Sequence, residues 1–372
     1  TEMFYTRMEK SGKYTVTVCF LENAVNAYNG LPLYSCKLLM QLQDWMKLLH
    51  QSAFGCEHLV TDEDAALSYV LREYQRVSPH AAPRTDRLAG DYSRVHLSWL
   101  HDGLTPETLT RMFCASATSE AHGTSRLESL ISTTVELIES GSIPLSSAEF
   151  EEDLTAWKAM GFPAVHHSEI FRTTYTPAYR VVSNRFANFL PLFSRLDTML
   201  AKGSVILALE GGSASGKSTL AESLREVYGC NVIHMDDFFL PPALRSPERL
   251  AQPGGNVHYE RFAEDVLPGL TSGEAFAYRI FDCGEMDFNG ERAIPTAPVR
   301  IVEGSYAHHP ELGKYADLRV FSTVDEGEQM ARILRRNGER MAEMFRTRWI
   351  PLEEAYFSAF AIKEKTAYVM KS

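Results

Sequence analysis

The stretch Ile206–Ala221, ILALEGGSASGKSTLA, decides how the second half of this 372-residue chain folds. An apolar run ends at a glycine-rich turn, and residues with high helix propensity follow the turn. The turn matches the pattern G-x-x-x-x-G-K-[ST], with Gly211, Gly216, Lys217 and Ser218 at its fixed positions. Glycines let the backbone curl tightly enough for successive N–H groups to surround a phosphate, and a helix that begins there adds its positive end. We therefore predict a strand, a phosphate-binding loop and a helix.

The loop predicts binding of a nucleoside triphosphate, and ATP and Mg²⁺ are the expected cofactors. Lys217 would reach the β- and γ-phosphates as a point charge, and Ser218 would offer its hydroxyl to the metal ion. A chance Gly-Lys-Ser in an ordinary turn is the alternative, and the strand and helix around the motif argue against it. The expected nucleotide-binding residues are Gly211, Gly212, Ser213, Ala214, Ser215, Gly216, Lys217, Ser218 and Thr219.

Composition indicates an ordinary globular protein and argues against some partners. Apolar residues make up 45% of the chain and charged residues 23%. The formal charge of -11 argues against a nucleic-acid-binding surface, because phosphate contacts need a basic patch. We find neither an apolar run of about 20 residues, as a membrane span needs, nor a charged-then-apolar leader. We therefore expect a cytoplasmic protein with a small-molecule substrate and no nucleic-acid or membrane partner, and homo-oligomerisation stays open.

The cysteines show no spacing that indicates a metal site or a disulfide framework. None stands in a C-x-x-C pair, and we interpret each as a small buried hydrophobic residue. They are Cys19, Cys36, Cys56, Cys114, Cys230 and Cys283.

The first part of the chain, residues 1–202, is predicted to be a mostly α-helical domain of unknown role. Residues 14–20 alternate and favour a strand that has no evident partner. Apolar residues then recur at helical spacing, with few β-like runs between the helical segments. The expected helices cover residues 31–50, 61–76, 105 onwards, 127–140, 146–160 and 186–200.

Two polar clusters in this domain have more than one interpretation. Residues 84–96 hold Arg84, Arg87, Asp91, Arg94 and His96, which we interpret as a solvated helix face with surface ion pairs. Residues 162–182 hold His166, His167 and Glu169, which stand too close together for a closed metal site. We interpret that second segment as an interdomain contact, with contact to a substrate or effector as the alternative.

Residues 203–372 alternate short β-like runs with helices, which predicts an α/β fold with a parallel sheet covered by helices. Ligands of such sheets bind where the strands end. Asp236 ends the run at residues 231–235 and is the candidate general base, while Asp237 is a candidate for the metal. Glu303 ends the run at residues 299–302 and is the expected metal-binding carboxylate. Arginines on and after the helix at residues 326–336 are candidates to bind phosphates, and we expect one or two of Arg332, Arg335, Arg336 and Arg340 to do so.

Residues 204–372 resemble the uridine kinase, pantothenate kinase and phosphoribulokinase family of P-loop kinases. The resemblance rests on the loop GGSASGKSTLA, on HMDDFFL around Asp236, on VEGSY after Glu303 and on the RILRR helix. It implies that Asp236 is the base and that Arg332 and Arg335 belong to the phosphate-binding lid.

The chain departs from uridine kinases where those bind the nucleoside. The segment GGNVHYERF stands in place of N-F-D-H-P-D, so that His258 occupies the position of a ribose-binding aspartate. FAYRIFDCGEMDF stands in place of Y-D-F-x-T-H, with Tyr278, Arg279 and Asp282 but without the Thr-His pair. We therefore list Asp236, His258, Tyr278 and Arg279 as candidate substrate-binding residues, where His258 and Arg279 could meet an anionic or differently hydroxylated acceptor.

These observations predict an ATP-dependent, uridine-kinase-like phosphotransferase that acts on a hydroxyl of a small metabolite. A nucleoside or nucleoside-like acceptor is the first expectation, and a sugar or small acid is the next. The alternative is a nucleotide-dependent regulatory ATPase or switch, in which the helical half is the output domain. The absence of an N-K-x-D motif argues against a GTPase.

Overall fold

The structure is a computed structural model, and it describes residues 41–56, 62–117, 123–143 and 145–371. The chain divides into two compact units, Thr1–Asp197 and Thr198–Ser372, which we call the N-terminal and C-terminal units. The division falls within helix α10 (Leu190–Leu200). Within the described residues, no helix combines the length and the apolar character that crossing a membrane requires.

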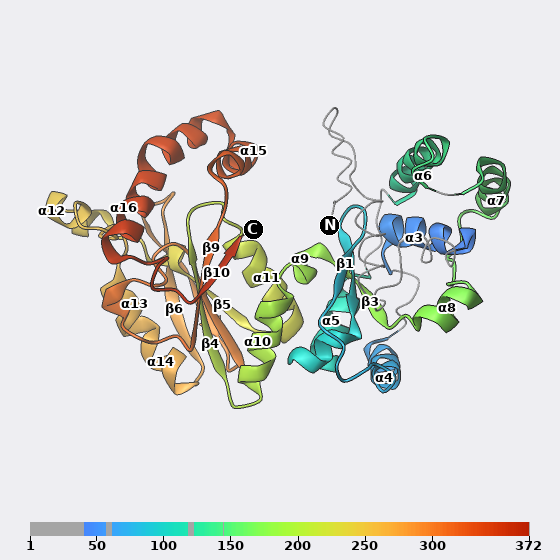
Figure 1. Cartoon of the computed structure of the whole chain (residues 1–372). Coiled ribbons are helices and arrows are strands. Elements are labelled where there is room, and N and C mark those ends of the chain that lie inside the picture. The colour runs from blue at the N-terminus through green and yellow to red at the C-terminus, as the bar shows by residue number, and fades with distance from the viewer. Residues whose placement is uncertain (1–40, 57–61, 118–122, 144, 372) are drawn as a thin grey trace. The chain divides into compact units, whose positions relative to one another are not determined.

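The C-terminal unit is built on a five-stranded parallel sheet with the order β10-β9-β4-β8-β5 (Figure 1). Strand β4 lies in the middle, and its residues are almost all buried because the sheet is covered on both faces. The register pairs Leu209 with Glu303 and Gly211 with Ser322, so β8 and β9 end beside the loop that follows β4. This confirms the predicted parallel sheet. Its strands are β4 (Val205–Gly211), β5 (Asn231–His234), β8 (Val299–Glu303), β9 (Leu318–Thr323) and β10 (Tyr368–Lys371).

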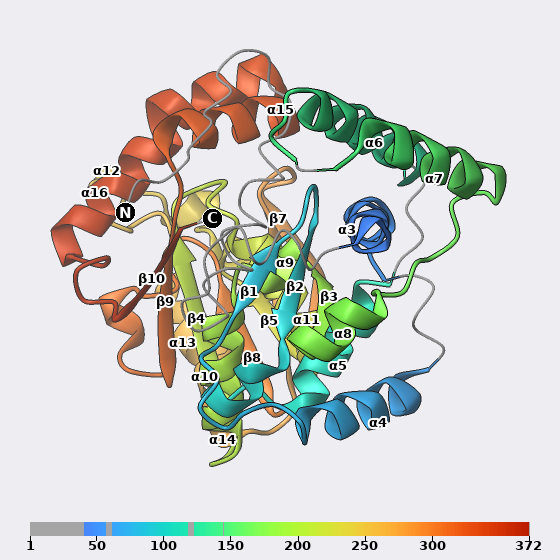
Figure 2. The same cartoon turned by 45° about the vertical axis from the view of Figure 1, so that its right-hand side comes forward.

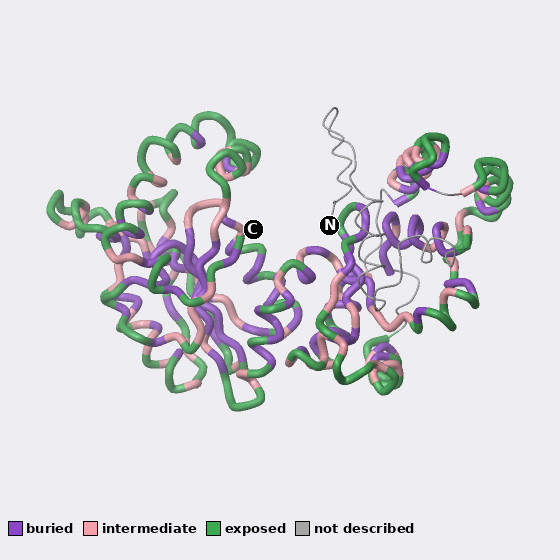
Figure 3. Tube along the Cα trace, viewed as in Figure 1, coloured by how far each residue is buried: buried purple, intermediate pink, exposed green. Residues whose placement is uncertain are grey.

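Helices cover both faces of this sheet. Helix α11 (Lys217–Tyr228) follows the glycine-rich loop directly and lies on one side, while α13 (Tyr259–Asp265) and α14 (Leu267–Ser272) lie on the other. The core between α13, α14 and the sheet is apolar and includes Phe262, Leu270 and Val302. Figure 3 shows the strands buried and the outer turns of these helices exposed. Short helical turns cover the connections, namely η3 (Met235–Phe238), η4 (Pro242–Leu244), α12 (Pro247–Leu250) and η5 (Pro310–Leu312).

A β-hairpin interrupts the parallel fold before β8. Strands β6 (Phe276–Asp282) and β7 (Asp287–Ile294) pair antiparallel, and Asp282 Oδ1 accepts a hydrogen bond from the Gly284 N–H at 2.6 Å in the turn. Strand β6 carries Tyr278 and Arg279, two of the candidate substrate-binding residues.

A long helical arm follows β9. Helix α15 (Glu326–Met344) runs past the expected end at residue 336 and is broken at Gly338, whose φ of 76° is non-helical. The π-helical turn η6 (Phe345–Trp349) and helix α16 (Ile350–Phe360) continue the arm, as Figure 2 shows in the red end of the chain. The arm therefore leads from the sheet out to α15 and back to the loop after β4 through α16.

The described part of the N-terminal unit is mostly helical, as predicted, and also contains a three-stranded antiparallel sheet. The strands are β1 (Thr85–Arg87), β2 (Tyr92–His96) and β3 (Tyr179–Ser183). The helices are α3 (Leu42–Phe54), α4 (Glu63–Tyr74), η2 (Leu97–Asp102), α5 (Pro106–Ala115), α6 (Gly123–Glu139), α7 (Ser147–Ala159), α8 (Glu169–Tyr175) and α9 (Asn184–Ala187). Trp45, Leu127 and Trp157 are the large apolar residues at the centre of its core.

The interpretation of residues 84–96 as a solvated helix face is wrong. They form β1 and β2, and Arg94 is only 2% exposed. The Arg94 guanidinium donates to Gln51 Oε1 from Nε at 2.9 Å and from Nη2 at 2.6 Å, and it lies over the ring of Tyr179. The buried position is tolerated because a polar partner on α3 and an aromatic face replace the lost water.

The cysteines differ among themselves. Cys56 and Cys230 are buried as expected, Cys114 is half-buried, and Cys283 is exposed on the hairpin, which corrects the expectation for that residue. Cys19, Cys36 and the strand expected at residues 14–20 lie outside the described residues.

Candidate active site

The glycine-rich loop has the geometry of a phosphate cradle. Gly216 is the N-cap of α11 with a φ of 83°, and Gly211 has a φ of 144°. A Cβ atom on Gly211 would lie 2.2 Å from the carbonyl oxygen of Ser322 on β9. Glycine is therefore required at this position both by the backbone angle and by the close approach of the neighbouring strand. Because the N-cap residue Gly216 has no side chain to cap them, the first N–H groups of α11 are available to a bound phosphate.

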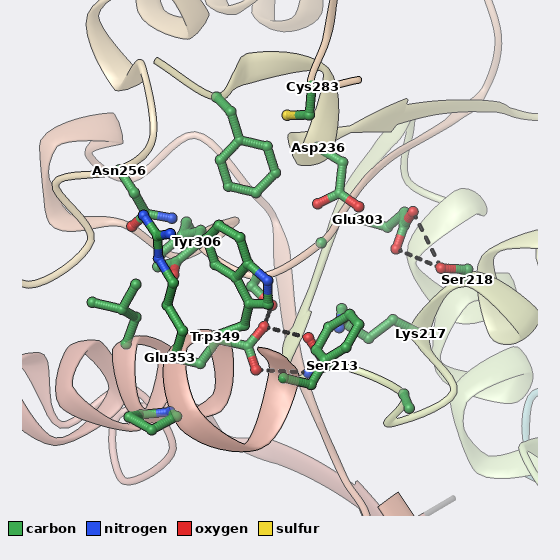
Figure 4. Close-up of a pocket in the computed structure, with 18 of the residues that line it drawn as sticks. Ser213, Lys217, Ser218, Asp236, Asn256, Cys283, Glu303, Tyr306, Trp349 and Glu353 are labelled. Carbon is green, nitrogen blue, oxygen red and sulfur yellow. Dashed lines mark hydrogen bonds between the residues drawn. The ribbon is translucent and has the colours of Figure 1, made fainter. Parts of the chain in front are cut away.

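A pocket of about 770 Å³ opens at this loop, at the end of the sheet where β4, β5 and β8 finish (Figure 4). Of the predicted nucleotide-binding residues, Ser213, Ala214, Lys217 and Ser218 line it, whereas Gly211, Gly212, Ser215, Gly216 and Thr219 do not. Lys217 Nζ donates to the carbonyl oxygen of Gly212 at 2.8 Å, so the ammonium group is held across the loop. The lining also includes Asp236, Phe239, Arg245, Asn256, Cys283, Glu303, Tyr306, Arg336, Arg348, Trp349 and Glu353.

Ser218 and Glu303 come together at the centre of the site. The Ser218 hydroxyl donates to the Glu303 carboxylate, with Oγ 3.2 Å from Oε2 and 3.4 Å from Oε1. His234 Nδ1 lies 2.6 Å from Glu303 Oε1. Burial alone would raise the pKa of Glu303, but the hydrogen bond and charge of His234 lower it, and Glu303 in turn raises the pKa of His234. A carboxylate kept ionised beside a hydroxyl presents the hard oxygen ligands that Mg²⁺ prefers.

The two neighbouring aspartates after β5 have different surroundings. Asp236 lines the pocket, and its side chain is accessible to solvent there. The protein atoms around the pocket nevertheless displace part of its water, and this desolvation, together with the charge of Glu303, raises the pKa of Asp236. Asp237 is buried and does not line the pocket. Its Oδ2 accepts hydrogen bonds from the Tyr278 hydroxyl at 2.8 Å and from Arg292 Nε at 3.1 Å. The structure therefore brings Asp236, and not Asp237, together with Ser218 and Glu303.

The candidate substrate residues on and before the hairpin do not line the pocket. Tyr278 bonds to Asp237, and the Arg279 guanidinium lies 4.0 Å from the ring centre of Phe288. His258 is the N-cap residue of α13, and its backbone N–H donates to the Phe238 carbonyl at 2.7 Å. Tyr278 and Arg279 therefore contact residues around the site, and His258 contributes a backbone bond, whereas Asn256 of the same segment as His258 lines the pocket.

Of the arginines on α15, some reach the loop or the pocket and others do not. Arg332 Nη1 donates to the Ala214 carbonyl in the loop at 3.2 Å, and Arg336 lines the pocket. Arg335 is 73% exposed and lies 4.0 Å from Glu328, outside the pocket lining. Arg245 and Arg348, which the motifs did not indicate, line the pocket as well. Neither belongs to a recognisable motif: Arg348 lies in the π-helical turn η6 and Arg245 in an irregular segment after η4, and the tertiary fold brings both to the pocket.

One carboxylate that the sequence did not indicate, Glu353, holds the glycine-rich loop through hydrogen bonds to Ser213. Glu353 of α16 is 6% exposed and accepts hydrogen bonds from the Ser213 N–H, the Ser213 hydroxyl and the Ser305 hydroxyl. Ser305 also donates to the carbonyl of Gly211 at 3.1 Å. The end of β8, the loop and α16 are thereby joined at one point.

A parallel sheet whose central strand leads through a glycine-rich loop into a helix, with a carboxylate at the end of the next strand, defines a P-loop nucleotide-binding domain. Among curated proteins, a uridine kinase from Chlamydia pneumoniae is 30% identical over 147 residues, which is 37% of this chain and 64% of that protein. This match confirms the resemblance to P-loop kinases of the uridine kinase type. The chain spans just under two thirds of the length of that relative.

Comparison with solved structures gives more distant likenesses. A possible uridine kinase from Bacillus stearothermophilus has 17% identity and a TM-score of 0.36, covering 48% of this chain and 99% of that one. A protein described as a fructose transport system kinase from Silicibacter sp. TM1040 has 23% identity and a TM-score of 0.36, covering 42% and 85%. No family model matches the chain.

Proposed function

We propose that this protein is an ATP-dependent kinase that transfers the γ-phosphoryl group to a hydroxyl of a small metabolite. The observation that carries the proposal is the position of Asp236, an exposed carboxylate in the same pocket as Lys217, Ser218 and Glu303. A protein that only senses nucleotide needs the loop and the metal ligands, but not a base beside them.

The residues of the pocket fit bound Mg·ATP. The loop backbone and Lys217 would hold the phosphates, and the Ser218 hydroxyl and the Glu303 carboxylate would hold Mg²⁺. When bound, the metal ion would neutralise phosphate charge. His234 keeps Glu303 ionised and oriented through its bond to Oε1.

Asp236 would accept the proton of the acceptor hydroxyl as that oxygen attacks the phosphorus atom. Its raised pKa suits a base, because proton transfer is most efficient when the pKa of the base lies closer to the operating pH. Arg332 and Arg336 would act on the developing phosphoryl charge, since Arg332 already contacts the loop and Arg336 lines the pocket. A nucleoside or nucleoside-like acceptor is our first choice, followed by a sugar or a small hydroxy acid.

The test is ADP release from Mg·ATP by the full chain, across nucleosides, sugars and small hydroxy acids, followed by the Asp236→Asn variant with the best acceptor. We expect strong stimulation by one class of compound and a loss of about 10²- to 10⁴-fold in kcat on removal of the base. Asp153→Asn on the exposed face of α7 is the control and should keep full activity. ATP binding without stimulation by any acceptor, or full activity of Asp236→Asn, would contradict the proposal and favour a nucleotide-dependent switch.

A further inference from the structure

Arg245 lines the pocket from an irregular segment after β5 and is held there by a backbone carbonyl. The residue is half-buried, and its Nε donates to the Leu240 carbonyl at 2.7 Å. Within the described parts of the chain, Arg245 forms no ion pair. Arg249, four residues further along the chain, does form one, with its Nη1 2.6 Å from Glu260 Oε1. The Leu240 bond fixes the guanidinium and leaves its terminal nitrogens available to a ligand.

Arg245 lies at another part of the pocket than Lys217 and Arg332, the cations expected to bind the phosphates of ATP. Lys217 and Arg332 contact carbonyl groups of the glycine-rich loop. Arg245, Cys283 and Asp236 line the same pocket. Desolvation and the charge of Asp236 raise the pKa of the Cys283 thiol, whereas the charge of Arg245 lowers it. In the close-up, Ser218, Glu303 and Asp236 follow one another across the pocket, and Asn256 lies on the side opposite Ser218 (Figure 4). Arg245 thus belongs with Cys283 and Asp236 on the acceptor side.

The charges of the pocket explain what such an arginine would recognise. Asp236, Glu303 and Glu353 make the wall near the transferred group acidic, which would repel an anionic acceptor unless a cation lay on the acceptor side. A neutral acceptor would leave the Arg245 guanidinium partly desolvated with no charged partner, and that costs free energy. Arg348, whose guanidinium lies 4.9 Å from the ring centre of Trp349, adds a second cation to the lining.

We propose that the acceptor, whether nucleoside-like, sugar or small acid, carries a carboxylate or phosphate group, and that Arg245 binds this anion while Asp236 faces the hydroxyl. Its body would lie against Phe239 and Tyr306, whose rings line the same pocket. Calling the ligand an acceptor rests on the proposed kinase function. The anion site itself does not, and it is tested first without turnover.

Cys283 provides that test because it is exposed and lines the pocket. Iodoacetate and iodoacetamide alkylate a thiolate by the same step, in which sulfur bonds to the CH₂ carbon and iodide leaves, but only iodoacetate is an anion. The rate ratio of the two reagents at Cys283, measured by mass spectrometry, reports attraction of a small carboxylate. We expect this ratio to fall severalfold in Arg245→Gln and to stay unchanged in Arg225→Gln, a surface arginine paired with Glu222. Any change in the Cys283 pKa affects both reagents alike and cancels. An unchanged ratio in Arg245→Gln would overturn the anion site.

Matched acceptors then test the kinase role of the site. ADP release is measured with ribose against ribose 5-phosphate, and with uridine against orotidine, which adds a carboxylate and keeps every hydroxyl. We expect the anionic member of a pair to be preferred, and Arg245→Gln to lower its kcat/KM about tenfold to a hundredfold, mainly through KM. The KM for ATP should stay the same. Better use of the neutral member would overturn the proposal while upholding the kinase, whereas no turnover with an intact alkylation result would count against the kinase alone.

Discussion

The carboxylate of Glu353 holds Ser213 in the glycine-rich loop at two points, 2.8 Å from the backbone N–H and 2.7 Å from the hydroxyl. Since Glu353 lies on α16, this contact links the arm α15–η6–α16 to the loop. A carboxylate near the phosphates would repel them, so Glu353 does not favour nucleotide binding through its charge. Its contribution is to fix the conformation of the loop. We regard Glu353 as a positioning residue for nucleotide binding.

Glu353→Ala should weaken ATP binding and lower stability. Alanine removes the acceptor of the Ser213 N–H and of the Ser213 hydroxyl, and leaving such a donor unpaired costs about 1 to 3 kcal/mol. We expect a raised KM for ATP and a lower melting temperature, measured with Glu354→Ala as control because Glu354 is the exposed neighbour. Indistinguishable behaviour of the two variants would refute the role of Glu353.

Stability should depend on pH through Glu210, the last residue but one of β4. It is fully buried and accepts bonds from the Gly211, Tyr306 and His308 N–H groups and from the Tyr356 hydroxyl. Burial raises its pKa from the usual 4.5 to about 7. The folded state therefore binds a proton that the unfolded state releases, so this contribution is full below pH 4.5 and is lost as pH rises through about 7.

Urea denaturation between pH 5 and 8 measures this contribution. As pH rises from 5 to 8, the free energy of unfolding of the wild type should fall by about 2 to 3 kcal/mol relative to that of Glu210→Gln, because a shift of one pKa unit corresponds to about 1.4 kcal/mol. Glu210→Gln itself will be less stable at pH 5, since its NH₂ group faces donors. If the stability difference between the two proteins did not change with pH, Glu210 would not titrate in this way.

The sequence predicts well those parts of the site that follow from strand ends. Ser218, Asp236 and Glu303 stand after β4, after β5 and at the end of β8, and parallel strands bring their carboxyl ends to one edge. Asp237 differs from Asp236 only by one position, but both lie in the helical turn η3, where the second carboxylate accepts a hydrogen bond from Tyr278 while the first lines the pocket. Local pattern carries no information about that choice.

Contacts between distant segments were not predictable. Glu353 lies 140 residues from Ser213, and no periodicity marks it. Strand β2, YSRVH, lacks the apolar alternation of a typical strand because Arg94 is buried against Gln51 from α3. A buried ionisable residue contradicts the usual pattern and is recognisable only once its partner is in place.

The N-terminal unit depends on another buried polar centre, Asp44 of α3. This residue is 1% exposed, and its carboxylate accepts bonds from His167 Nδ1 at 2.9 Å, from the Ser168 N–H at 3.0 Å and from the Ser168 hydroxyl at 2.6 Å. Desolvation lowers the pKa of His167 to about 4, so the histidine is neutral near pH 7 and donates as an uncharged group. These bonds fix residues 167–168 to α3.

Asp44→Asn should destabilise the N-terminal unit by about 2 to 4 kcal/mol, because the new NH₂ group meets donors on both sides of the buried site. Hydrogen exchange followed by mass spectrometry should show faster exchange in α3 and α8, while β4 and α11 of the C-terminal unit stay protected. Asp64→Asn on the exposed start of α4 is the matched control. Equal protection of α3 and α8 in both variants would show that Asp44 contributes little.

Alanine substitutions at two glycines, Gly211 in the loop and Gly229 after α11, separate the effect of backbone strain from the effect of steric contact. Gly211 and Gly229 both have positive φ, 144° and 60°. A Cβ on Gly211 meets the Ser322 carbonyl at 2.2 Å, whereas one on Gly229 meets no atom of the described residues within 4 Å. Gly229→Ala should therefore cost about 1 kcal/mol from the left-handed backbone alone. Gly211→Ala must move β9 away from the loop, so we expect a larger loss of stability together with loss of ATP binding, measured by thermal unfolding with and without Mg·ATP.

The response of these two variants to ATP separates the cradle from the rest of the fold. Because ATP stabilises only the form that binds it, the ligand-induced rise in melting temperature should persist in Gly229→Ala and vanish in Gly211→Ala. A normal rise in Gly211→Ala would mean that the strand and the loop separate at little cost, and that the close packing of Gly211 against Ser322 does not shape the cradle.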